Sequence, residues 1–175
     1  MSLFVLVSGP PGSGKTTLAA PLAARLELPL ISKDVIKEAL MESLGAPATV
    51  EESRRLGRAA TEVMRALAET TSGAVLENAF TVTGAPMWRS LPGTIVEVRC
   101  SCPRELALAR YRGRTGDRHR GHLDALRDES EIWNDDLLTP LGVGSLIDVD
   151  TSAAVDLDAL VEQIRAVGTE EPGSP

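Results

Sequence analysis

The chain has 175 residues, a length that suits one domain with a full hydrophobic core and is short for two. Hydrophobic residues at 43% and charged residues at 25% are ordinary for a globular protein, and no apolar run reaches the roughly 18 residues that a membrane span needs. The net charge of −7 argues against nucleic acid as a partner and gives no reason to expect an anionic membrane.

The first predicted element is a buried strand over residues 3–8, which leads into a glycine-rich loop. The loop has the spacing G-x-x-x-x-G-K-[ST] and consists of Gly9, Pro10, Pro11, Gly12, Ser13, Gly14, Lys15 and Thr16. Its backbone N–H groups and the following helix can hold a polyphosphate. We predict a nucleoside triphosphate site in which Lys15 reaches the β- and γ-phosphates, Thr16 binds Mg²⁺ and Thr17 adjoins the nucleotide; the alternative is a chance glycine-rich turn.

Helices and strands alternate along the rest of the chain. Four-residue spacing of leucines predicts a helix over 14–26, bent at Pro21. A long helix over 51–71 should bury Leu56, Val63, Leu67 and several alanines, with Gly73 just past its end. The other predicted strands are 28–32, 74–77, 94–100 and 146–149, and the other helices are 34–43, a short piece after Pro86, 103–111, 123–137 and 156–167.

This alternation predicts an α/β fold, with a mainly parallel sheet covered by helices on both faces. We expect a single domain over 1–168 and a flexible tail over 169–175. Ligands of such sheets bind beyond the carboxyl ends of the strands. The residues that follow each predicted strand are therefore the candidates for function.

Asp34 follows the second predicted strand, where a carboxylate could take the proton of an acceptor hydroxyl. The alternative is structural, because Ser32 or Asp34 could simply cap the following helix. Lys33 stands beside Asp34 and is expected to contact the acceptor.

Glu77 ends the third predicted strand, as the acid of a Walker B element does. It could bind Mg²⁺ through water, serve the acceptor, or be only a polar strand end. Asn78, Phe80 and Trp88 follow near the expected acceptor cleft, and core packing is the alternative for the two aromatic residues.

Arginines crowd into residues 104–120, although the protein is acidic overall. A lid over about 112–121, hinged at its glycines, could bring Arg110, Arg114 and Arg118 to the phosphates. The alternative is a solvated basic surface. His119 and His122 could touch the acceptor, and zinc is improbable without a third ligand at metal spacing.

Three residues after the fifth predicted strand, Asp150, Thr151 and Ser152, could form a loop that binds the nucleotide base, or else cap the last helix. The two cysteines, Cys100 and Cys102, read as core or near-core residues. With few cysteines and no secretory signal at residues 1–8, a cytoplasmic location is expected.

The order of these motifs resembles the small P-loop kinases with the nucleoside-monophosphate-kinase-like core. The loop at 9–16, Ser32-Lys33-Asp34-Val35-Ile36, Leu76-Glu77 and the arginine-rich segment look most like the branch with chloramphenicol phosphotransferase, gluconate kinase and zeta toxins. The resemblance implies a three-layer P-loop NTPase fold with strand order 2-3-1-4-5, and it implies that Asp34 is the base toward the acceptor hydroxyl.

The leading hypothesis is Mg²⁺-dependent transfer of the γ-phosphate of ATP or GTP to a hydroxyl of a small molecule. The resemblance adds an antibiotic, as in chloramphenicol or capuramycin phosphotransferases, as a possible acceptor. The alternatives are a polynucleotide or nucleotide kinase, disfavoured by net acidity and scarce lysine, and a regulatory NTPase without an acceptor. A monomer or a homodimer is expected.

Overall fold

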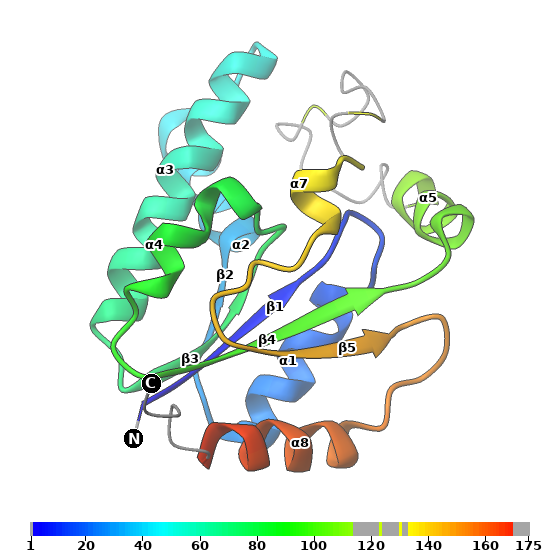
Figure 1. Ribbon diagram of the computed structural model, residues 1–175. Coiled ribbons are helices and arrows are strands. Elements are labelled where there is room, and N and C mark those ends of the chain that lie inside the picture. The colour runs from blue at the N-terminus through cyan, green and yellow to red at the C-terminus, as the bar shows by residue number, and fades with distance from the viewer. Residues whose placement is uncertain (1, 114–122, 124–129, 131–132, 170–175) are drawn as a thin grey trace.

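The computed structural model describes residues 2–113, 123, 130 and 133–169. Figure 1 shows a central sheet with helices on both faces. The elements are β1 (Leu3–Ser8), α1 (Lys15–Leu26), β2 (Leu30–Ser32), α2 (Lys33–Leu44), α3 (Val50–Glu69), β3 (Gly73–Glu77), the 3₁₀ turn η1 (Val82–Gly84), α4 (Ala85–Arg89), β4 (Thr94–Ser101), α5 (Arg104–Gly113), α7 (Asp135–Leu138), β5 (Ser145–Asp150) and α8 (Leu157–Thr169).

The five strands form a parallel sheet in the order β2-β3-β1-β4-β5, which confirms the expected fold and strand order. Successive residues of β1 alternate between the two faces. Val5 and Val7 pack with α1 and α8, whereas Phe4 and Leu6 pack with α3 and α4. Because all five strands are parallel, their carboxyl ends share one edge of the sheet.

Helix α3 differs in part from its predicted inner face: alanines are buried as expected, but the larger residues expected there are not. The residues that it buries are Ser53, Ala60, Met64 and Ala68, while Val63 and Leu67 are exposed and Leu56 is half-buried. Small residues let the helix lie close to the sheet, so the larger side chains project from its sides. Gly73 does not follow the helix end directly but opens β3, where a Cβ would lie 2.6 Å from the carbonyl oxygen of Leu3.

Of the helix expected over 123–137, residues 124–129 and 131–132 lie outside the described residues, and the expected ends of the helix are wrong. Leu123 has a left-handed φ of 52°, and Asn134 is extended. Asn134 accepts a hydrogen bond from the backbone N–H of Leu137 at 3.2 Å and so caps the short helix α7. None of the helices within the described part of the chain is long and apolar enough to cross a membrane.

A buried carboxylate, Glu97 of β4, holds the chain segment that leads into β5. Its oxygens accept the backbone N–H of Leu141 at 2.9 and 3.0 Å and that of Gly142 at 3.3 Å, and the side chain is 1% exposed. These charge-assisted hydrogen bonds hold residues 141 and 142 in place and so position the edge strand β5 beside β4.

We expect Glu97→Ala to lower the free energy of unfolding by about 3 kcal/mol, because it leaves the buried Leu141 N–H and the partly buried Gly142 N–H without their acceptor and opens a cavity. Urea unfolding measures the change. Glu42→Ala, on the exposed side of α2, is the matched control and should stay within about 0.5 kcal/mol of the parent. An equal effect of both substitutions would contradict a structural role for Glu97.

Candidate active site

The glycine-rich loop lies between β1 and α1, and its close contact with α5 requires glycine at one of its positions. Gly12 has a φ of 80°, and a Cβ there would overlap the carbonyl oxygen of Ala107 in α5. Only glycine can adopt this conformation at such a close approach. The loop is therefore held against the first part of α5 as well as at the amino end of α1.

Lys15 is the first residue of α1, and its Nζ donates to the carbonyl oxygen of Pro10 at 3.4 Å. The ammonium thus lies over the loop itself. Ser13 is fully buried, and its Oγ has no hydrogen-bond partner within the described residues. A bound phosphate oxygen is the kind of acceptor that such an orphaned hydroxyl requires.

Glu77 joins the loop to the neighbouring strand. Its Oε1 accepts a hydrogen bond from Thr16 Oγ1 at 3.0 Å, and its Oε2 accepts one from Ser32 Oγ at 2.6 Å. The side chain is 3% exposed. A hydroxyl and a carboxylate are hard oxygen ligands, so Thr16 and Glu77 fit Mg²⁺ that keeps several of its waters.

Asp34 lies in the first turn of α2, not at its cap. Ser32 occupies the N-cap position, and no side chain caps this helix because the Ser32 hydroxyl is bound to Glu77. The capping explanation of Asp34 is therefore wrong. Its Oδ1 lies 3.4 Å from Lys33 Nζ, and the Asp34 side chain is 40% exposed.

A cavity of about 550 Å³ adjoins the loop and is mostly apolar. It is lined by Thr17 of α1, Arg110 of α5, Thr151 and the segment that leads into α8, including Val155 and Leu157. Arg110 Nη2 donates to the carbonyl oxygen of Thr151 at 3.0 Å. An apolar cavity beside a phosphate-binding loop suits a nucleoside.

Of Asp150, Thr151 and Ser152, Thr151 alone lines this cavity within the described part of the chain, and Asp150 is the last residue of β5. Thr151 Oγ1 lies 2.6 Å from the carbonyl oxygen of Ser13 and 3.0 Å from that of Ser101. Asp150 accepts the backbone N–H of Ser152, which holds the pKa of the Asp150 carboxyl below its usual value. Asp156, rather than these residues, caps the start of α8.

A second cavity, of about 310 Å³, lies between α2, α3, α4 and the segment after β3. Lys33, Asn78, Phe80 and Trp88 all line it, so these expected acceptor-site residues come together. Phe80 and Trp88 are also core residues, with ring centroids 5.0 Å apart in an edge-to-face contact. Phe80 and Trp88 therefore pack in the core, as the alternative predicted, and also line the second cavity.

The remaining candidates fall largely outside the described residues. Arg114, Arg118, His119 and His122 lie there. The expected lid began at 112, but Arg112 and Gly113 belong to the last turn of α5. Gly113 lines the first cavity.

Comparison with known proteins assigns the chain to a family. A family model described as an AAA domain (AAA_33) matches residues 4–131. The chain belongs to this AAA domain family. No match was found among curated proteins.

Among solved structures, one from Chloroflexus aurantiacus, provisionally described as a kinase, is 31% identical with a TM-score of 0.82, covering 95% of this chain and 98% of that one. Shikimate kinase from Acinetobacter baumannii is 20% identical with a TM-score of 0.58, covering 94% and 91%. A gluconokinase from Sinorhizobium meliloti is 20% identical with a TM-score of 0.55, covering 93% and 89%. The last two likenesses concern the fold, which is that of P-loop kinases.

Sequence reasoning missed Ser32 as a partner of Glu77 in this AAA domain. The available signal was its place as the last residue of β2, directly opposite Glu77 in the register of β2 and β3. Residues that pair at the carboxyl ends of neighbouring parallel strands lie at the ligand-binding edge.

The two thiols near the loop differ in accessibility. Cys100 is buried in β4, where burial raises its pKa to about 12, whereas Cys102 is half-buried, with Sγ 4.0 Å from the carbonyl oxygen of Gly12. Thiolate is the reactive form. We expect iodoacetamide at pH 7.5 to modify Cys102 alone, as mass spectrometry of the native protein would show. Equal labelling of both thiols would contradict the packing of β4.

Proposed function

We propose that this protein is a kinase that transfers the γ-phosphate of a nucleoside triphosphate, ATP or GTP, to a hydroxyl of a small molecule. The observation that carries the proposal is the Thr16–Glu77–Ser32 contact. It connects the phosphate-binding loop with the end of β2, directly before α2, whose first residue Lys33 lines the second cavity and whose second residue is Asp34. This contact supports a nucleotide site and an acceptor site that are linked through the buried carboxylate of Glu77.

The chain's own residues divide the work of phosphoryl transfer. Lys15 and Arg110 neutralise phosphate charge, while Thr16 and, through water, Glu77 would hold Mg²⁺. The ion, when bound, withdraws charge from the β- and γ-phosphate oxygens. Asp34 accepts the proton of the acceptor hydroxyl while the oxygen of that hydroxyl forms the new bond to the γ-phosphorus. The bond from the γ-phosphorus to the β–γ bridging oxygen breaks at the same time.

Family and comparison support the general reaction and leave the acceptor open. The fold is shared by the Chloroflexus aurantiacus protein that is provisionally described as a kinase, by shikimate kinase and by gluconokinase. An antibiotic acceptor rests on the resemblance to the chloramphenicol phosphotransferase branch alone. We also propose a single domain over 1–168, a lid formed by the arginine-rich segment around 112–121, a cytoplasmic location and a monomer or homodimer.

The test is a screen of hydroxylated compounds with ATP and GTP labelled in the γ-phosphate. Label recovered in a compound above the level of hydrolysis supports a kinase. Label released only as inorganic phosphate, whichever compound is present, would instead favour an NTPase without an acceptor.

A further inference from the structure

The second cavity has an unusual charge for a protein with a net charge of −7. Its described lining includes four basic residues and no acidic one. The basic residues are Lys33, Lys37, Arg54 and Arg58. From this we infer that the acceptor carries an anionic group, a carboxylate or a phosphate, in addition to the hydroxyl that is phosphorylated. This inference rests on the proposed function.

The cations come from two helices that face each other. On α3, the lining residues Ser53, Arg54, Gly57, Arg58 and Thr61 share one side, because they repeat at helical spacing. On α2, the Lys33 ammonium nitrogen lies 3.8 Å from the point where a Cβ of Gly57 would stand. The absence of a side chain at Gly57 therefore leaves room for Lys33 against α3.

Lys37 of α2 is a buried cation that contacts α3. It is 2% exposed, and its Nζ donates to Ser53 Oγ at 2.8 Å. Lys37 therefore adds a buried, hydrogen-bonded positive charge to the wall of the cavity.

The ion pairs of Arg58 and Lys33 leave these two cations able to bind a ligand. Arg58 contacts Glu51 at 2.9 Å and Lys33 contacts Asp34 at 3.4 Å, and neither acid belongs to the described lining. The Arg58 and Glu51 side chains are 65% and 70% exposed, so their attraction is weak in water. A guanidinium can exchange such a contact for a two-pronged bond to a ligand oxyanion.

The opposite wall is apolar. Phe80 and Trp88 are 3% and 2% exposed, and Met87 lies beside them in the lining. A volume of about 310 Å³ is at the small end for ligand sites. The cavity therefore suits a compound of roughly one ring or a short polyol, with a carbon skeleton on the aromatic wall and an anionic group toward Arg54 and Arg58.

The test compares acceptors that differ in charge and little else. Labelled ATP is offered with glycerol against glycerate and glycerol 3-phosphate, with glucitol against gluconate, and with quinate methyl ester against quinate. We expect kcat/KM to be about tenfold or more higher for the charged member of at least one set. The carboxylate and phosphate arms distinguish the two kinds of anion.

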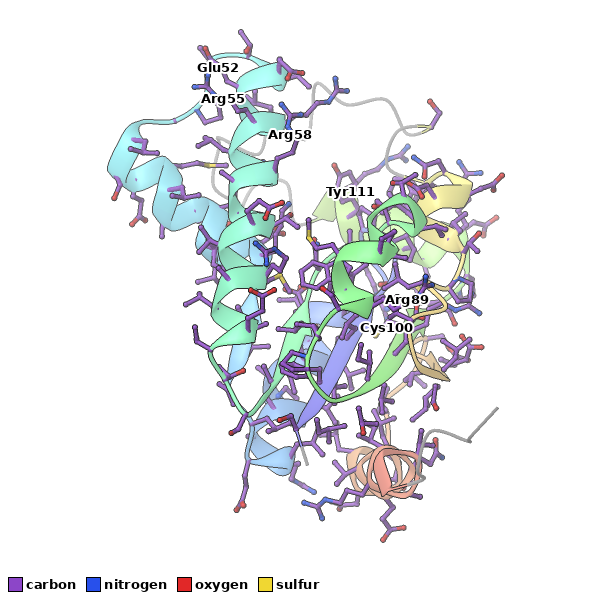
Figure 2. The ribbon with its side chains drawn as sticks, turned by 60° about the vertical axis from the view of Figure 1, so that its left-hand side comes forward. Glu52, Arg55, Arg58, Arg89, Cys100 and Tyr111 are labelled. Carbon is purple, nitrogen blue, oxygen red and sulfur yellow. The ribbon has the colours of Figure 1, made fainter. Side chains whose placement is uncertain are left out.

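Neighbouring arginines provide matched variants. Arg54 lines the cavity, whereas Arg55 is an exposed residue outside its described lining; Figure 2 shows Arg55 and Arg58 on the amino-terminal half of α3. The double variant Arg54→Gln, Arg58→Gln should raise KM for the charged acceptor about tenfold with little change in kcat or in nucleotide binding. Arg55→Gln should match the parent, and Gly57→Met should impair acceptor use by filling the cavity.

Each outcome decides between the claims. Equal or better transfer to the neutral compounds, or equal KM values for the double variant and Arg55→Gln, would overturn the anionic acceptor and leave the proposed kinase standing. Hydrolysis of ATP with no transfer to any compound would count against the kinase itself, and the inference would fall with it.

Discussion

Lys15→Ala is expected to lower turnover about a thousandfold while leaving the fold intact. Lys15 is the first residue of α1, and its ammonium nitrogen lies over the loop, 3.4 Å from the Pro10 carbonyl oxygen. Removing it leaves the charge that moves during transfer without its nearest compensation. Alanine at the first helical position preserves α1, because alanine has the highest helix propensity.

Steady-state turnover with saturating nucleotide, measured beside the thermal midpoint, checks this result. Arg25→Ala, at the far end of α1, removes a positive charge from the same helix and should keep near-normal turnover. A folded Lys15→Ala protein with activity near the parent value would remove the central claim about the loop.

Asp34→Asn is expected to reduce acceptor phosphorylation by about 10²- to 10⁴-fold, the usual contribution of a general base. Asparagine keeps the size of the side chain and loses the ability to take a proton. Because Ser32 holds the N-cap position without a side-chain cap, the substitution does not remove a helix cap. Stability and nucleotide affinity should therefore change little.

The measurement is turnover at unchanged melting temperature, with nucleotide binding followed in parallel. Glu42→Gln, an exposed acid of the same helix, is the control. Activity of Asp34→Asn within a few-fold of the parent would contradict a catalytic role. A loss of nucleotide binding as large as the loss of turnover would assign Asp34 to the metal instead.

The sequence was sufficient for the parts of the fold that depend on local pattern. The spacing of the loop at 9–16 and the alternation of apolar strands with helices predicted the parallel sheet, and the resemblance supplied its strand order. These signals are strong because a buried parallel strand must be apolar on both faces, as β1 is.

The errors arose where packing overrides pattern. In α3, Val63 and Leu67 were expected inside together with alanines. Ala60, Ala68 and also Met64 are buried, whereas Val63 and Leu67 are exposed. Over 123–137, acidic residues at helical spacing concealed the extended Asn134. Propensity is a weak guide when a side chain such as Asn134 offers the backbone a local hydrogen bond.

The polar links of the site were partly beyond sequence reasoning. Glu77 was a candidate from its position, yet its simultaneous contacts with Thr16 and Ser32 join residues 61 and 45 positions apart. Spacing along the chain carries no record of such pairs, which depend on the register of neighbouring strands. The same holds for the basic lining of the second cavity, assembled from α2 and α3.

Thr151 gives the phosphate-binding loop a dependence on the order of synthesis. Its hydroxyl supports the Ser13 carbonyl oxygen, yet it follows β5, which emerges from the ribosome after the other four strands. A nascent chain that ends before residue 145 already carries the complete loop sequence and β1 to β4, but not this support. The loop therefore gains this contact only after β5 has been synthesised, and we expect a chain truncated before residue 145 to bind nucleotide less tightly than the full chain.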